Sequence, residues 1–405
     1  MDFEFTSEQT QLADAVRRFV DKDYGFEKRK KVVASTAGGS DEIWAKLVEL
    51  GLTALPMPEE RGGFGGTAVD LLPVMRELGR GLVAEPFFAT IFAAEFIKRA
   101  GGDAHNAILE KVADGSIKMA AALAEAQSRY DLFDVKTSAS RIGESFALAG
   151  RKAIVPFGAQ ADHLIVSARM RDHGADQDPG CADGDLALFV VDARAKGVTR
   201  RDARMLDGHR VADIALDRVE VGADALLARG SLARELIDAV SDYGVALLAA
   251  EATGAMEALN AATLEYAKTR KQFGQPIARF QALQHRMVDM FMHFEQALSM
   301  AYLAAVKVDS TDVVERRKTL SAAKVRIGQA ARFIGQQAVQ IHGGMGMTDE
   351  LLAAHLFKRL TMIELTLGDT DHHLQRFIAA SKEEPTGDER GLTKEEGVAL
   401  LQRAA

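Results

Sequence analysis

Cysteine is nearly absent from the sequence, because the 405 residues include only Cys181. One cysteine cannot form an intrachain disulfide, which excludes a disulfide-stapled secreted fold. The residues around Cys181 are rich in aspartate, which raises the pKa of a thiol rather than activating it. We therefore interpret Cys181 as a residue of a surface loop.

Long apolar runs and basic runs are also missing. No stretch is apolar over the length that a transmembrane helix needs, so we expect no membrane insertion. The first residues are acidic and polar, unlike a secretory signal peptide, which makes the cytoplasm the expected location. The net charge of −8 gives no electrostatic basis for binding nucleic acid.

Aromatic residues make up only 6% of the chain, whereas alanine and leucine are plentiful. This balance favours a mostly helical protein over a β sandwich or barrel. A hydrophobic fraction of 47% in 405 residues is enough to fill the cores of two or three domains.

Helical periodicity dominates both ends of the chain. A helix is expected to start near Thr6 and Gln9, and apolar spacing predicts further helices over residues 41–51, 69–79, 88–100 and 108–114. Proline and glycine make residues 56–66 a loop. Long amphipathic helices are expected over residues 232–270, 281–308, 312–341 and 351–366.

Short β-type runs lie between these helical regions. They predict strands at residues 135–138, 146–149, 163–166, 186–191 and 211–216, with an exposed insertion over residues 171–185. The expected fold is mostly α with a central β domain. We predict an N-terminal helical domain (1–117), a middle β domain (118–230), a C-terminal helical bundle (231–380) and a charged tail (381–405).

Two segments carry candidate binding chemistry. The first, YAKTRKQFGQPIARFQ, runs from Tyr266 to Gln281 and breaks a long helix at Phe273. Arg270 can complement the dipole of the helix C-terminus, but an arginine beside a glycine turn can also present its planar fork to a diphosphate. The second, QIHGGMG, begins at Gln340 and leaves backbone N–H groups open to a close ligand, unless it is only a turn between helices.

Together, at this spacing and in this architecture, the two segments resemble the acyl-CoA dehydrogenase family. The N-terminal part resembles it too, in the strings FTSEQ (5–9) and PEERGGFG (58–65) and in Trp44 followed by LGL (50–52). The resemblance covers nearly the whole chain. It is nearest to the small-subunit type described for pimeloyl-CoA dehydrogenase, judged by SRYDL (128–132) and GDTDHHL (368–374).

The resemblance implies FAD, an acyl-CoA thioester substrate, an electron-transfer flavoprotein as acceptor, and a homo-tetramer or a heterotetramer with a second subunit of the same family. It implies contacts to the FAD of a neighbouring subunit by Arg270, Phe273, Gln281, Gln340, Gly343 and Gly344. Thr370 is also carried over as a cofactor contact. Asp242 matches a position that touches the CoA part of the substrate, although Val245 replaces an arginine that usually follows it.

The sequence departs from the family pattern where the family holds the flavin ring in its own subunit. A threonine that hydrogen-bonds the ring is replaced by Ala124, and a tryptophan against the ring is replaced by Ile154. A second threonine becomes Pro156, which has no N–H to offer.

The catalytic base is the second departure. The reaction removes a proton from Cα while a hydride leaves Cβ, and a carboxylate in a dry pocket is a suitable base. A gapless count from Gly344 puts Leu367 at the position of the family glutamate, whereas a count anchored on residues 374–376 puts Asp369 there. We favour Asp369; the alternative is that it caps a helix through residues 372–378. An earlier base position used by some members corresponds to Gly244, which cannot serve.

Histidines do not indicate a metal site, because His342, His372 and His373 lack a third nearby ligand. Three hypotheses remain. The chain is an FAD enzyme that oxidises an acyl-CoA to the trans-2-enoyl-CoA with Asp369 as base. Alternatively, it is the partner subunit of a heteromeric dehydrogenase and supplies only the neighbour-facing strip. The third is a flavin monooxygenase of the same fold, which needs no carboxylate base.

Overall fold

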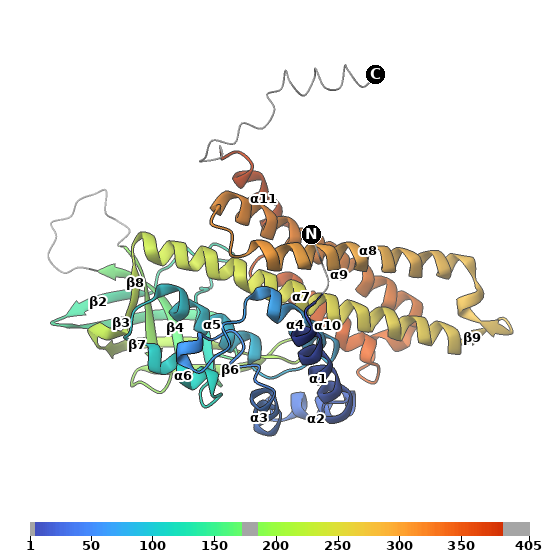
Figure 1. Cartoon of the computed structure of the whole chain (residues 1–405), viewed down its shortest axis with the longest axis horizontal. Coiled ribbons are helices and arrows are strands. Elements are labelled where there is room, and N and C mark those ends of the chain that lie inside the picture. The colour runs from blue at the N-terminus through green and yellow to red at the C-terminus, as the bar shows by residue number, and fades with distance from the viewer. Residues whose placement is uncertain (1–4, 172–184, 384–405) are drawn as a thin grey trace, which may run out of the picture.

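The computed structural model describes residues 5–171 and 185–383 (Figure 1). The insertion predicted at residues 171–185, including Cys181, and most of the charged tail lie outside the described residues. The helices before the sheet are α1 (Ser7–Asp23), α2 (Phe26–Ala34), α3 (Asp41–Glu49), α4 (Ala68–Arg80), α5 (Phe87–Ala100) and α6 (Asn106–Ala113). After the sheet come α7 (Ser231–Thr269), α8 (Gln281–Lys307), α9 (Val313–His342), α10 (Leu352–Leu365) and α11 (Thr370–Ala380).

The sheet between these groups has the strand order β6-β7-β3-β2-β4-β5-β8, and β1 pairs with β4. Its strands are β1 (Met119–Ala122), β2 (Ser138–Ile142), β3 (Ser145–Pro156), β4 (His163–Arg171), β5 (Leu186–Asp192), β6 (Val198–Arg204), β7 (Arg210–Val221) and β8 (Leu226–Arg229). The β1–β4 and β2–β4 pairs are parallel, and the other neighbours are antiparallel. The expected fold class, helices around a central sheet, is confirmed.

Most expected elements are present with small shifts, but some predictions were incomplete. The strand predicted at residues 135–138 begins only at Ser138, and α2 together with β1, β6 and β8 was not predicted. Strand β6 has the sequence VTRRDAR and lies at the sheet edge, mostly exposed, so it carries little apolar pattern. Strand β1 is MAAA, which has low β propensity and forms a strand because it pairs with the buried β4.

Helix α7 connects the parts of the molecule (Figure 1). Its 39 residues contribute to three of the four apolar clusters in the described residues, through Tyr243, Leu248 and Leu236 among others. A helix that is apolar on all sides must be buried on all sides. Helix α7 thus lies between the N-terminal helices and helices α8–α10, and it positions both candidate sites described below. No helix in the described ranges is both long and apolar enough to cross a bilayer.

Candidate active site and cofactor strip

The first predicted segment forms an exposed hairpin at the end of α7. Arg270 follows the last turn of α7, and the short strands β9 (Lys271–Gln272) and β10 (Gln275–Pro276) pair around Phe273. Phe273 is 91% exposed and has a left-handed φ of 52°, so its ring is presented to solvent. Gln281 begins α8 directly afterwards and is also exposed.

The second predicted segment lies beside the first. Tyr266 stacks on His342 with ring centroids 4.4 Å apart, and its hydroxyl donates to the His342 carbonyl at 3.3 Å. Gly343 and Gly344 follow at the start of a short 3₁₀ helix (Gly343–Met347), and a Cβ at either glycine would meet nothing within 4 Å. The two segments therefore form one exposed surface, which we call the end strip: Arg270, Phe273, Gln281, Gln340, Gly343 and Gly344.

The end strip lies at the far end of the helical bundle from the sheet, as the positions of β9 and of β2–β8 show in Figure 1. A strip in that place cannot reach the sheet of its own chain. Its exposed arginine, aromatic ring and open glycine backbone fit a diphosphate and a planar group held by another subunit. The role in trans that the resemblance implies stays a prediction.

Ala124, Ile154 and Pro156 form the wall that is expected to hold a flavin ring within the same chain. This wall offers few free polar groups. The N–H of Ile154 donates to Asp213 Oδ1 at 3.2 Å, and the carbonyl of Ala124 accepts from Ala153 N at 2.9 Å. Pro156 has no N–H. Ile154 is 65% exposed with a φ of 54°. The residues of the end strip fit the cofactor, whereas the described groups of this wall at Ala124, Ile154 and Pro156 offer its ring few hydrogen-bond partners.

Leu367, the alternative to Asp369 for the family's base position, faces Gly244, the earlier base position of some members. Leu367 adopts a left-handed φ of 58° in the loop between α10 and α11. A Cβ built on Gly244 would lie 2.6 Å from Cδ1 of Leu367 and 2.7 Å from the ring of Phe92. The side chain of Leu367 thus points at Gly244, and its hydrocarbon fills the gap between the two residues.

Asp369, in the same loop, is the N-cap residue of α11. Its Oδ1 accepts from the N–H of His372 at 2.8 Å, which caps α11, and its Oδ2 accepts from Arg129 at 3.3 Å. Partial burial opposes ionisation, but the His372 N–H and the Arg129 guanidinium outweigh it and lower the pKa of Asp369. A general base benefits from a raised pKa. The capping role left open by the sequence is therefore present, and it competes with the role of base.

Thr370 is hydrogen-bonded to Glu364. Both the N–H and the hydroxyl of Thr370 donate to Glu364 Oε1, at 3.1 and 2.9 Å. Below them the buried Lys324 donates to the carbonyls of Glu364 and Gly368 at 2.8 and 2.6 Å. Desolvation lowers the pKa of Lys324 to about 7. Lys324 thus fixes both sides of the loop that carries Leu367, a role that no local sequence signal indicated.

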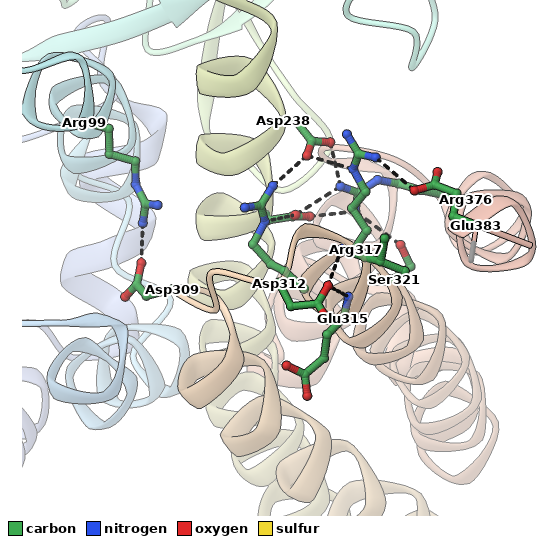
Figure 2. Close-up of polar contacts among 12 residues, drawn as sticks. Arg99, Asp238, Asp309, Asp312, Glu315, Arg317, Ser321, Arg376 and Glu383 are labelled. Atoms are coloured by element: carbon green, nitrogen blue, oxygen red, sulfur yellow. Dashed lines mark hydrogen bonds and ion pairs between the residues drawn. The ribbon is translucent and has the colours of Figure 1, made fainter. Parts of the chain in front are cut away.

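Asp242 lies in a buried ion network rather than on an open surface. Its Oδ1 accepts from Arg376 at 2.6 Å and its Oδ2 from Arg316 at 3.0 Å, with 1% of the residue exposed. Asp238 joins the network through Arg317 and Arg376 (Figure 2). Burial would raise the pKa of Asp238, but the arginines outweigh it and lower the value. Both carboxylate oxygens of Asp242 are occupied, so its direct contact to CoA remains a prediction.

Glu251, Arg359 and Asp207 form a second buried charge cluster. Glu251 accepts two hydrogen bonds from Arg359, at 2.6 and 2.8 Å, and Arg359 also donates to Asp207 at 2.9 Å. Glu251 therefore faces this ion pair. Glu251 and Arg359 also line a partly open pocket together with the buried Glu85 and His209, and neither Glu85 nor His209 was identified from the sequence.

Comparisons with known proteins cover most of the chain. The N-terminal, middle and C-terminal domain models of acyl-CoA dehydrogenase match residues 6–116, 120–219 and 239–381. The chain is 28% identical to a probable acyl-CoA dehydrogenase, YngJ of Bacillus subtilis, over 94% of this chain and 99% of that protein.

Two solved structures share the fold. One is a variant of the Tcur3481–Tcur3483 steroid ACAD, with a TM-score of 0.82 and 26% identity over 92% of this chain and 97% of that one. The other is the ChsE4–ChsE5 complex from Mycobacterium tuberculosis, with a TM-score of 0.84 and 24% identity over 95% and 100%. The chain therefore belongs to the acyl-CoA dehydrogenase family of flavin-dependent oxidoreductases, for which FAD is the expected cofactor.

Proposed function

We propose that this chain is one subunit of a heteromeric acyl-CoA dehydrogenase. It supplies the end strip to an FAD that a second kind of subunit holds. The α,β-dehydrogenation of an acyl-CoA thioester to the trans-2-enoyl-CoA takes place in that second subunit. One observation carries the proposal. Leu367 and Gly244 face each other, and neither residue has a carboxylate side chain.

The chemistry requires a base and an electron acceptor at the same place. The bound FAD would accept the hydride from Cβ, and a carboxylate must take the proton from Cα. This chain lacks that carboxylate at Leu367 and Gly244, and its own wall at Ile154 and Pro156 offers the ring few partners. The end strip, in contrast, is exposed and complete. This asymmetry favours a subunit that completes the site of another chain.

The similar solved structures support a complex of two different chains, since two of them, Tcur3481–Tcur3483 and ChsE4–ChsE5, are named for two proteins each. We infer a heterotetramer with a second acyl-CoA dehydrogenase subunit, and an electron-transfer flavoprotein as the acceptor of the electrons. Oxidation within this chain, with Asp369 as the base, is the alternative. It requires Asp369 to leave both the His372 N–H and Arg129.

The test uses the complex of this chain with a flavin-binding subunit of the same family. Arg270→Ala should raise the dissociation constant of FAD from the complex at least tenfold, because a diphosphate contact is lost. Arg279→Ala is the matched control, since Arg279 is exposed close by but lies outside the end strip. If the Arg270→Ala complex retained FAD as tightly as the control, the strip would not serve the cofactor of the partner.

A further inference from the structure

Strand β6 forms one edge of the sheet. Strand β7 pairs with it from Val198 to Arg204 without a shift in register, and no described strand pairs with its other side. At the opposite edge, β8 packs against α5 and α7. No helix in the described ranges covers β6 in this way, because β7 is its main contact. A regular edge strand that is left uncovered is a template for pairing with another chain.

The backbone of β6 directs a row of polar groups away from β7. At its two ends, the Asp217 N–H donates to the Gly197 carbonyl and the Met205 N–H donates to the His209 carbonyl, both at 2.9 Å. Alternate residues of an antiparallel strand bond to the same neighbour, so residues 199, 201 and 203 bond to β7. The N–H and C=O groups of Arg200, Asp202 and Arg204 therefore point outward, and none of them has a backbone partner in the described residues.

The same strand is strongly basic. Residues 194–204 include five basic residues and one acidic residue, although the whole chain has a net charge of −8. The acidic residue, Asp202, is already engaged by Arg210 at 3.3 Å. Lys196 and Arg201 are exposed, and neither has an ion pair within the described ranges. The row of outward backbone groups thus lies in a local field that attracts negative charge.

Charge and backbone together select the kind of partner. A second copy of this chain would place β6 against β6, and like charges on paired strands are destabilising. A nucleic acid would use the positive charge but not the alternating N–H and C=O groups. An acidic polypeptide in extended conformation uses both. The charged side chains point to the faces of the sheet, so they leave the backbone edge open to a strand of opposite charge.

We propose that β6 is a docking edge for an extended acidic segment of a partner protein, which adds to the sheet as a further strand. Its backbone pairs with Arg200, Asp202 and Arg204, and its carboxylates lie beside Lys196 and Arg201. Backbone hydrogen bonds supply affinity in this mode of recognition, and side chains supply the preference for one partner. The proposal does not rest on where FAD binds, because all the groups it uses belong to this chain.

The test measures binding of labelled peptides to the full chain by fluorescence anisotropy at low salt. The probe is a short peptide that alternates glutamate with valine, and a second peptide has lysine in place of glutamate. We expect the acidic peptide to bind about tenfold more tightly than the lysine peptide. An acidic peptide with N-methylated amides keeps the charges but cannot donate to the ladder, so it should bind about tenfold more weakly than the unmodified one.

A proline tests the backbone edge directly. Asp202→Pro removes an outward N–H without removing a bond to β7, and its ring obstructs an incoming strand. It should weaken binding of the acidic peptide about tenfold. Asp202→Ala is the matched control, because it removes the same carboxylate but keeps the N–H, and it should bind the acidic peptide at least as tightly as the original chain.

A charge reversal keeps the outcome clear if the proline variant fails to fold. Arg201→Glu should weaken binding of the acidic peptide about fivefold and strengthen binding of the lysine peptide. Arg141→Glu, at an exposed arginine of β2, is its control and should change neither affinity. Four results would each overturn the proposal: no binding of the acidic peptide at millimolar concentration, equal affinity for the N-methylated peptide, an effect of Arg141→Glu as large as that of Arg201→Glu, or equally tight binding of a single-stranded oligonucleotide.

Discussion

Cδ1 of Leu367 lies 2.6 Å from the point where a Cβ on Gly244 would stand. The loop after α10 and the middle of α7 therefore approach each other at the place where the family positions its catalytic carboxylate. A hydrocarbon side chain opposite a glycine cannot accept the Cα proton. The proposed heteromeric function rests on this pair more than on any single substitution in the sheet.

The contact between these residues predicts a coupled effect on stability. Gly244→Ala should lower the free energy of unfolding by about 1–3 kcal/mol, because the added methyl group overlaps Leu367 and Phe92. In a Leu367→Ala background the destabilisation by Gly244→Ala should be smaller by about 1 kcal/mol, because the shortened side chain at position 367 leaves room for the added methyl group. Urea unfolding of the four proteins in this cycle measures the coupling. Purely additive costs would contradict the contact.

Asp369→Asn tests whether that carboxylate acts as a base or as a cap. Loss of the ion pair with Arg129 and a weaker cap on α11 should lower the free energy of unfolding by about 0.5–1 kcal/mol. The dehydrogenation rate of the complex should be unchanged within about twofold. Asp371→Asn, at an exposed carboxylate in the first turn of α11, is the control. A rate that fell by orders of magnitude only in Asp369→Asn would identify Asp369 as the base.

Glu85 predicts a specific dependence of stability on pH. Its pKa is about 7 in the folded chain and 4.5 as the ordinary value. The folded state thus binds the proton more tightly, and the free energy of unfolding falls as the pH rises from about 4.5 to about 7. The loss amounts to roughly 3 kcal/mol. Glu85→Gln should be more stable than the original chain at pH 8.5 and nearly equal to it at pH 4.5. Parallel stability curves for the two proteins would refute this assignment.

The buried ion network around Asp242 predicts that replacing this one carboxylate with an amide lowers the free energy of unfolding strongly. Asp242→Asn leaves Arg316 and Arg376 with one carboxylate fewer in a site that is 1% exposed. Breaking a buried pair in this way costs about 3–5 kcal/mol. Glu383→Gln, at the exposed edge of the same network, should change the free energy of unfolding by less than about 0.5 kcal/mol. Thermal unfolding of the two variants measures this difference. Equal small shifts of the unfolding temperature would show that the network contributes little to stability.

The helices of the bundle were predictable from the sequence because their apolar pattern is long and local. Helices α7 and α9 begin and end within one residue of the expected bounds. The polar edge strand β6 and the alanine-rich β1 could not be found in the same way, because pairing in the sheet rather than their own side chains makes them strands. The residues of the end strip could be named from the sequence because its two segments resemble motifs of the family.

The remaining features depend on contacts between distant parts of the chain. Lys324 fixes the Leu367 loop from another helix, and Glu85 and His209 line the same pocket from distant parts of the chain. No spacing in the sequence relates these pairs. The choice between Leu367 and Asp369 depended on where a gap was placed. The structure adds that Leu367 has a left-handed backbone and that Asp369 caps α11, and Asp369 as the base stays a prediction.

The visible absorption spectrum of this chain, expressed and purified alone, tests the central claim most directly. The account predicts a folded protein without stoichiometric flavin absorbance, whose complex with a flavin-binding subunit of the family is yellow and bleaches when an acyl-CoA is added. A chain that is yellow by itself, with one flavin per subunit that bleaches on adding an acyl-CoA, would contradict the account.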